Sequence, residues 1–144
     1  MITPNIIALI KKHEGCSLVP YSDSMGFSTI GFGHLCRQDE DFSNGITQDQ
    51  ADLMCLADIS TAYGDALSLF PKMDGICEAR QAVLVDIAFN LGRQKLSHFV
   101  NFIAAVIAER WVQAAYELRN SLWYNQVGDR GIEDRLIILT GEFQ

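Results

Sequence analysis

The chain has 144 residues, 49% of them hydrophobic, and a formal net charge of −7. That length suits one compact unit with a real core, and no apolar run approaches the roughly 18 residues that a transmembrane helix needs. The acidic balance, without a visible basic patch, argues against a nucleic-acid partner, because such proteins bring positive charge to the phosphates. We therefore expect no membrane span and no nucleic-acid partner.

The first predicted helix ends at a carboxylate. Thr3 and Pro4 suit its N-cap and first turn, and Gly15 suits the position after its last turn. Glu14 follows Ile10 on the same helical face, where burial and the unpaired carbonyls of the helix end would both favour a protonated carboxyl group. A general acid needs that form, although an isolated glutamate at a helix end is more often simply solvated.

A run of turn formers over residues 21–26 precedes a glycine-rich strand pattern, which predicts a β-hairpin or small sheet. Strand alternation places Thr29 on one face with Gly31 and Gly33, and such a face would let a ligand come close. Asp23, hydrated in the turn, could hold a water molecule. Two carboxylates in unlike environments are the usual equipment for cleaving a glycosidic bond, although a turn aspartate and a strand threonine are each ordinary when taken alone.

The rest of the chain is predicted to be helical. A surface loop over residues 35–45 leads to Thr47 and Gln50, which form a capping box at the start of a long helix that Pro71 ends. Further helices are predicted over residues 78–91 with Gly92 as the stop, from a Ser97 cap through residue 107, over 111–118, and over 130–140 with Gly141 as the stop. Short loops between them favour antiparallel neighbours.

These elements predict a mostly helical α+β fold. It would have a small N-terminal lobe with a β-hairpin or small sheet, a long connecting helix and a C-terminal helical bundle. We expect a single domain over residues 1–144, made of an N-terminal α/β lobe over 1–46, a connecting helix over 47–70 and a helical lobe over 71–144.

The four cysteines are Cys16, Cys36, Cys55 and Cys77. They show no C-x-x-C spacing and no nearby histidine cluster, which argues against a zinc site. Because no export signal is recognisable, we expect free thiols, with Cys55 buried as a small apolar side chain. Disulfides that form after release stay open as an alternative.

Glu14 is followed after eight residues by Asp23, after five more by Thr29, and then at once by Ile-Gly-Phe-Gly-His, residues 30–34. This pattern resembles the phage-type lysozymes, the T-even phage endolysin family within family 24 of the glycoside hydrolases. The resemblance implies that Glu14 is the proton donor and that Asp23 and Thr29 position the attacking water. It also implies inversion at the anomeric carbon and a lysozyme-like domain.

Two later blocks match the same family, so the resemblance covers nearly the whole chain. They are Ala88-Phe89-Asn90-Leu91-Gly92 on the central helix and Trp123-Tyr124-Asn125-Gln126, followed by Arg130, near the C-terminus. Two features depart from the family. The stretch after His34 is short, and Leu122 stands where an arginine often precedes the second block, which bears on substrate contacts more than on the chemistry.

The resemblance also implies supporting contacts. Arg130 would face Glu14 and add a positive charge that opposes the effect of burial. Asp58 would pair with His34 and hold the hairpin on the long helix, a structural role. The alternatives are a solvated surface arginine and a satisfied, half-buried strand histidine.

Substrate contacts are expected from Phe89, Asn90, Asn125 and Gln126. Amide groups suit hydrogen bonds to sugars and peptides, yet each amide also has a plainer explanation. Asn90 lies four residues after Asp86 on an apolar helix, and we favour a buried hydrogen-bonded pair between them by about two to one over a substrate contact. A helix-end cap explains Asn125 and Gln126 equally well.

The implied function is that of an endolysin-type muramidase. Such an enzyme hydrolyses the β-1,4 bond between N-acetylmuramic acid and N-acetylglucosamine in peptidoglycan, and we expect it to act as a monomer without a metal or organic cofactor. Two other classes stay open. A lytic transglycosylase cuts the same bond without a water-holding carboxylate, so Asp23 and Thr29 argue against it. A non-catalytic wall-binding or virion structural module would keep the fold without the chemistry.

We expect the protein to be made in the cytoplasm of a host bacterium. Its first ten residues lack both a basic start and a long apolar centre, so they predict no export signal. Action in the periplasm or cell wall would follow release through a separate pore protein or carriage in a virus particle. The charge of −7 fits poorly with approach to an anionic wall, which would make binding slow or dependent on delivery.

Overall fold

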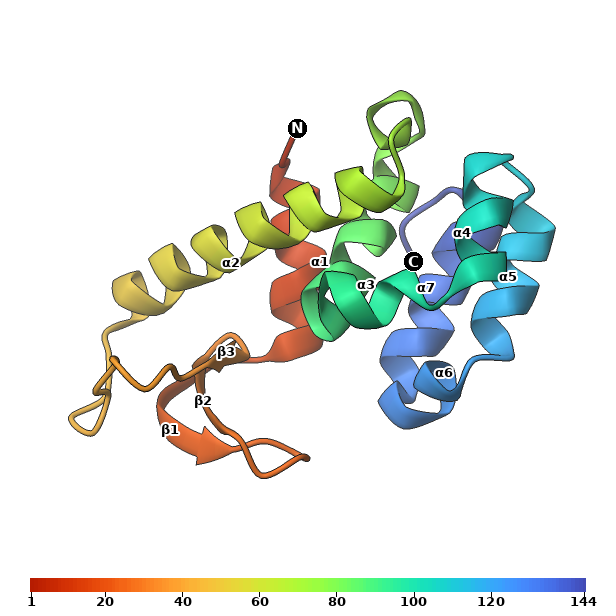
Figure 1. The fold of residues 1–144 in the computed structure, drawn as a ribbon. Helices are drawn as coiled ribbons and strands as arrows, with labels where there is room; N and C mark the ends of the chain where they lie inside the picture. Colours follow the sequence, from red (N-terminus) through yellow and green to blue (C-terminus); the bar gives the residue numbers. More distant parts are fainter.

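The computed structural model describes residues 1–144 and confirms a mostly helical α+β fold. The elements in chain order are α1 (Pro4–Glu14), β1 (Ser17–Ser22), β2 (Ser28–Gly31), β3 (His34–Leu35), α2 (Gln48–Leu69), the 3₁₀ turn η1 (Met73–Gly75), α3 (Glu78–Ser97), α4 (Val100–Ile107), α5 (Trp111–Arg119), α6 (Leu122–Val127) and α7 (Asp129–Thr140). Figure 1 shows the small sheet beyond the end of α1, and α2 running from the sheet to the helical part.

Helix α1 begins and ends where the sequence predicts. The Thr3 hydroxyl accepts a hydrogen bond from the Ile6 amide, and Gly15 follows the last turn with φ of 65°. The helix packs mainly against α3 and buries Ile6 and Ile10 completely. Its last residue, Glu14, is therefore held by a well-packed element.

The predicted small sheet has three antiparallel strands in the order β1–β2–β3. Strand β2 ends at Gly31, and the chain turns through residues 32–33 before β3, with positive φ at Gly31 and Gly33. The prediction that Thr29 shares an open strand face with both glycines is therefore wrong, because the turn breaks the alternation of the strand. Thr29 itself is buried, with 2% of its surface exposed.

Helix α2 starts with the predicted capping box, in which Thr47 and Gln50 exchange hydrogen bonds with each other's backbone amides. It ends just before Pro71. Its buried face consists of small and β-branched residues packed on α3, namely Ala51, Cys55, Ile59, Ala62 and Ala66. Cys55 is buried as predicted, which raises the pKa of its thiol to about 11, and all four cysteines are unpaired.

The helical part differs from its prediction at two boundaries. Helix α3 continues past Gly92, but the backbone there is non-helical, with φ of 77° and ψ of 161°, so Gly92 produces a kink instead of an end. Ser97 does not cap α4, because its hydroxyl donates to the Gln94 carbonyl and α4 begins only at Val100. The short helix α6 was not predicted; the Ser121 hydroxyl caps it by accepting from the Tyr124 amide.

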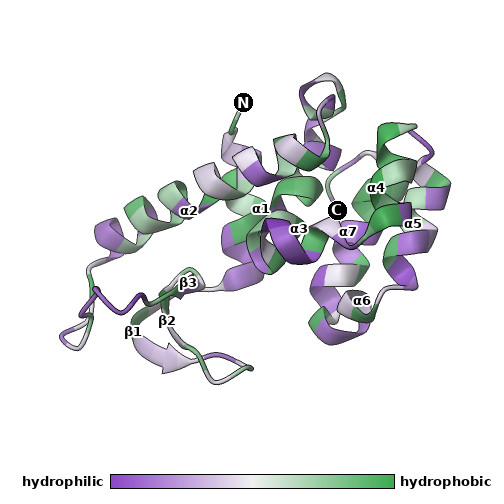
Figure 2. Cartoon of the chain, viewed as in Figure 1, coloured by the Kyte–Doolittle hydropathy of each residue, from purple (hydrophilic) through white to green (hydrophobic).

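One continuous hydrophobic core runs from α1 to α7. Figure 2 shows mostly hydrophobic residues on α4 and mixed surfaces on α2 and α6. None of the helices is both long and apolar enough to cross a membrane. The core thus joins the helix that carries Glu14 to the helix that carries Arg130.

Candidate active site

Glu14 lies between the turn that joins β2 to β3 and an arginine from α7. Its Oε1 accepts a hydrogen bond of 2.8 Å from Arg130 Nη1, and 15% of its side chain is exposed. On the other side, a Cβ built at Gly33 would lie 2.9 Å from the Glu14 carboxyl carbon. Only a residue without a side chain leaves room for this carboxyl group, and Gly33 also has a φ of 73° that favours glycine.

Asp23 occupies the turn between β1 and β2. Its Oδ1 accepts hydrogen bonds from the amides of Met25, at 2.9 Å, and Phe27, at 2.8 Å. Its Oδ2 accepts none from the protein and is left for a ligand or water. Burial raises the pKa of Tyr21, and the negative charges of Glu14 and Asp23 raise it further. Both carboxylates therefore lie within electrostatic reach of the same tyrosine.

Thr29 supports the same turn. Its hydroxyl donates to the Phe27 carbonyl at 3.0 Å, and Phe27 also hydrogen-bonds Asp23. The structure thus places Thr29 behind the Asp23 turn instead of on an open strand face.

A groove of about 350 Å³ lies beside the turn that carries Gly33, the glycine against which the Glu14 carboxyl group packs. Glu14, Asp23 and Thr29 are not themselves among the residues that line it. It is formed by the β2–β3 turn, β3, α2 and α3, and its lining residues are Gly33, His34, Leu35, Arg37, Asp58, Thr61, Ala62, Asp65, Ala88, Phe89 and Gly92. Gly33 belongs both to this lining and to the contact with Glu14. The side chain of Phe89, a predicted substrate contact, forms part of the wall.

The other predicted substrate contacts lie outside this lining. Asn90 Oδ1 accepts a hydrogen bond of 2.8 Å from the indole of Trp123, so the predicted pair between Asn90 and Asp86 does not form. Asn125 and Gln126 are exposed on α6, and their side chains make no hydrogen bond within the protein. Their amide groups are free to meet a ligand.

His34 fixes the sheet to α2. Its Nδ1 lies 2.8 Å from Asp58 Oδ2, and its Nε2 lies 3.0 Å from Glu40 Oε1. Burial alone would lower the pKa of His34, but these two carboxylates raise it overall. The contact with Glu40, which lies in the loop after β3, was not predicted from the sequence.

Asp86, on α3, holds Arg130 in place. Arg130 Nε donates to Asp86 Oδ2 at 2.9 Å, and Nη2 donates to Oδ1 at 2.8 Å, which leaves Nη1 for Glu14. Burial alone would raise the pKa of Asp86, but hydrogen bonds and charge from His13 and Arg130 lower it overall. This role was not predicted, although a single aspartate among the apolar residues of this helix was a signal for it.

His13 extends the same network. Its Nδ1 lies 2.9 Å from Asp86 Oδ2, and its Nε2 lies 2.9 Å from Glu133 Oε2. His13, Asp86 and Asp134 also offer metal-ligand atoms within 4.8 Å of one another. Both Asp86 oxygens are already paired with Arg130, so a cation there would have to compete with the guanidinium group for the same atoms.

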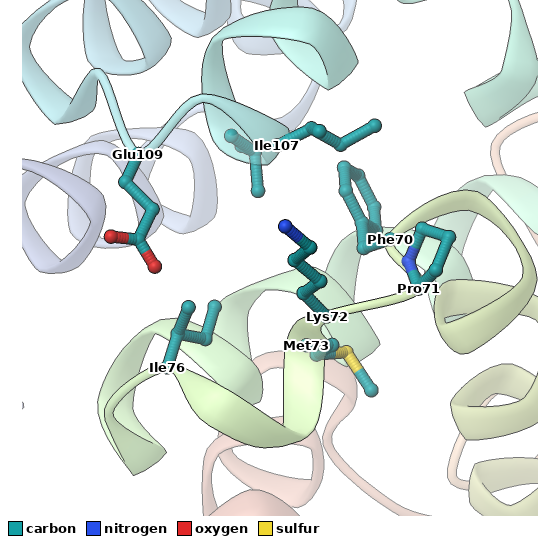
Figure 3. A pocket seen from close by; sticks show the side chains of 8 residues that line it. Phe70, Pro71, Lys72, Met73, Ile76, Ile107 and Glu109 are labelled. Atoms are coloured by element: carbon teal, nitrogen blue, oxygen red, sulfur yellow. The ribbon is translucent and has the colours of Figure 1, made fainter.

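A separate apolar pocket of about 120 Å³ lies between the end of α2 and α4 (Figure 3). Phe70, Met73 and Ile107 contribute to its wall, and Lys72 and Glu109 bring charged groups to it. None of the predicted site residues lines this pocket. The groove beside Glu14 is therefore the candidate active site.

Comparison with known proteins agrees with this geometry. The model of the phage lysozyme family matches residues 11–136. The chain is similar to the pre-baseplate central spike protein Gp5 of Enterobacteria phage T4, with 27% identity over 94% of this chain, and it spans only 28% of that protein. It is also similar to the probable T4-type lysozymes 1 and 2 of Dictyostelium discoideum, each with 24% identity, over 92% and 85% of this chain and 92% and 86% of those proteins.

Proposed function

Since the chain belongs to the phage lysozyme family, we propose that it is a muramidase that hydrolyses the β-1,4 bond between N-acetylmuramic acid and N-acetylglucosamine in peptidoglycan. The observation that carries this proposal is the Glu14 carboxyl group, which packs against Gly33 of the groove lining, is held by Arg130 and shares Tyr21 as a neighbour with Asp23. Two carboxylates near a groove are the equipment for glycoside hydrolysis.

In the proposed reaction Glu14 donates a proton to the leaving glycosidic oxygen. Asp23, whose Oδ2 accepts no hydrogen bond from the protein, orients a water molecule on the opposite face of the sugar ring, and Thr29 supports the turn that holds Asp23. This water attacks the anomeric carbon and inverts its configuration. Arg130 stabilises the carboxylate that Glu14 becomes once its proton has left.

Substrate positioning is proposed for Phe89 in the groove lining and for three amide side chains outside it. Phe89 offers an apolar wall for a sugar ring. The exposed amides of Asn125 and Gln126 can donate to and accept from polar groups of the glycan or its peptide. Asn90 uses its oxygen on Trp123, so only its NH₂ group is left for the substrate.

Digestion of purified Gram-negative peptidoglycan tests the proposal, with the soluble fragments identified by mass. The wild type should release reducing muropeptides, and Glu14→Gln should release none. Glu142→Gln is the control, because it makes the same chemical change at an exposed position near the C-terminus. It should behave like the wild type. Circular dichroism verifies that each variant is folded. Anhydro products would identify a lytic transglycosylase instead.

A second candidate is a wall-binding or structural module of a virus particle. The similarity to a phage spike protein, of which the chain spans 28%, favours this candidate and also favours carriage in a particle over release through a pore protein. Such a module would cosediment with peptidoglycan and release no fragments from it. In either case we propose that the protein is made in the cytoplasm of a host bacterium and acts as a monomer at the periplasm or cell wall.

A further inference from the structure

We propose that Asp134 works as a neutral carboxylic acid behind the candidate active site, where it donates a hydrogen bond to Asp86 and so keeps Arg130 positioned on Glu14. Asp134 would be a positioning residue, because it acts on Glu14 only through Asp86 and Arg130. The inference deepens the proposed muramidase function and rests on it for its activity readout.

The surroundings of Asp134 argue for its neutral form. Its side chain is fully buried on α7, and neither carboxyl oxygen accepts a hydrogen bond. A buried carboxylate without a donor is strongly disfavoured, whereas a protonated carboxyl group can itself donate. A carboxyl oxygen of Asp134 lies within 4.8 Å of one of Asp86, whose oxygens are acceptors. Burial and the charge of Asp86 raise the pKa of Asp134 well above its ordinary value.

His13 lies beside Asp86, and its Nδ1 lies 4.0 Å from Asp134 Oδ1, beyond hydrogen-bonding distance. Both ring nitrogens of His13 face carboxylate oxygens, Asp86 Oδ2 on one side and Glu133 Oε2 on the other, each at 2.9 Å. A ring that donates on both sides carries two protons and a positive charge. Burial alone would lower the pKa of His13, but Asp86 and Glu133 raise it overall.

The cluster around Asp134 contains groups of both charges. The groups that face it come from three helices: Lys12, His13 and Glu14 on α1, Asp86 on α3, and Arg130, Glu133 and Asp134 on α7. With Asp134 neutral, the cations Lys12, His13 and Arg130 face the anions Asp86 and Glu133, and Glu14 joins them as an anion once it has donated its proton. Ionisation of Asp134 would place a second negative charge directly beside Asp86, which is already ionised.

Loss of the Asp134 proton would affect Glu14 indirectly, through Asp86 and Arg130. Asp86 uses both oxygens to grip Arg130, and this grip leaves Nη1 directed at Glu14 Oε1. An ionised Asp134 would repel Asp86 and compete for Arg130. The guanidinium group would then be drawn away from Glu14 toward the interior.

Two substitutions distinguish the hydrogen bond that Asp134 donates from the space that its side chain fills. Asp134→Asn keeps an uncharged side chain with hydrogen-bond donors, whereas Asp134→Leu keeps the volume without any donor. We expect Asp134→Leu to lower kcat about tenfold, the effect of one hydrogen bond, and Asp134→Asn to restore most of this loss. Equal kcat values for the two folded variants would overturn the proposal.

Nuclear magnetic resonance tests the protonation state of Asp134 without an activity assay. In ¹³C spectra of the carboxyl carbons, one aspartate should remain protonated at pH 7 in the wild type and be missing from Asp134→Asn. The Arg130 Nε signal should shift in Asp134→Leu and stay in place in Asp134→Asn. An ionised Asp134 at pH 7, or stabilisation by Zn²⁺ that Asp134→Asn abolishes, would overturn the proposal. If these signals behave as expected but peptidoglycan stays uncut, the proposed function fails and the role of Asp134 stands.

Discussion

Replacing Gly33 by alanine should abolish most of the proposed muramidase activity by displacing Glu14. The new Cβ would lie 2.9 Å from the Glu14 carboxyl carbon, and because ordinary contacts between carbon atoms start near 3.5 Å, the carboxyl group must retreat by roughly 0.6 Å or more. One of its oxygens is closer still. A displacement on the order of 1 Å in a reacting group can cost about 100-fold in rate, and we expect a loss of that size in kcat.

The same substitution also strains the backbone, because Gly33 has a φ of 73°. Positive φ costs a residue with a side chain about 1–2 kcal/mol. Gly128→Ala is a matched control, since Gly128 has a φ of 59° and a Cβ there would meet nothing within 4 Å. Both variants should lose similar unfolding free energy in urea, and only Gly33→Ala should lose kcat in the release of reducing ends from peptidoglycan. Equal kcat values in the two variants would refute the reasoning.

Two further predictions concern the network behind Glu14. Asp86→Asn leaves the Arg130 guanidinium with Glu14 as its remaining anionic partner. Because a buried ion pair is then broken, urea denaturation should show that the free energy of unfolding falls by about 3–5 kcal/mol. A fall below about 1 kcal/mol would show that the pair adds little to stability. The pKa of His13 is raised in the folded protein, so its stabilising contribution is complete below the unfolded value of about 6.5 and is lost as pH rises through the folded pKa. The difference in unfolding free energy between wild type and His13→Gln should therefore shrink from pH 6 to alkaline pH, and a constant difference would contradict this assignment.

Local sequence signals predicted the helix ends that depend on neighbouring residues. The Thr3 cap, the Gly15 stop and the capping box of Thr47 and Gln50 each involve residues within one helical turn, so their geometry follows from the sequence nearby. Glycine alone was a less reliable signal of where a helix ends. Gly92 was expected to end a helix and produces a kink, because the tertiary packing of α3 continues beyond it.

The candidate site was only partly predictable. The resemblance to phage-type lysozymes singled out Glu14 and Arg130, which the structure brings to 2.8 Å. The grip of Asp86 on Arg130 joins positions 44 residues apart, and its contact with His13 spans 73 residues. No local pattern encodes such distances, because they depend on how α1, α3 and α7 pack together.

The pairing of Arg130 with both Glu14 and Asp86 has a consequence for protein synthesis. Arg130 follows Glu14 by 116 residues and Asp86 by 44, so the pair with Glu14 can form only after the whole stretch between them has been synthesised. A nascent chain or an early-terminated fragment would lack the arginine that holds the proposed proton donor. The proposed wall-cutting activity would therefore require synthesis through Arg130, and copies that stop before it would lack that activity.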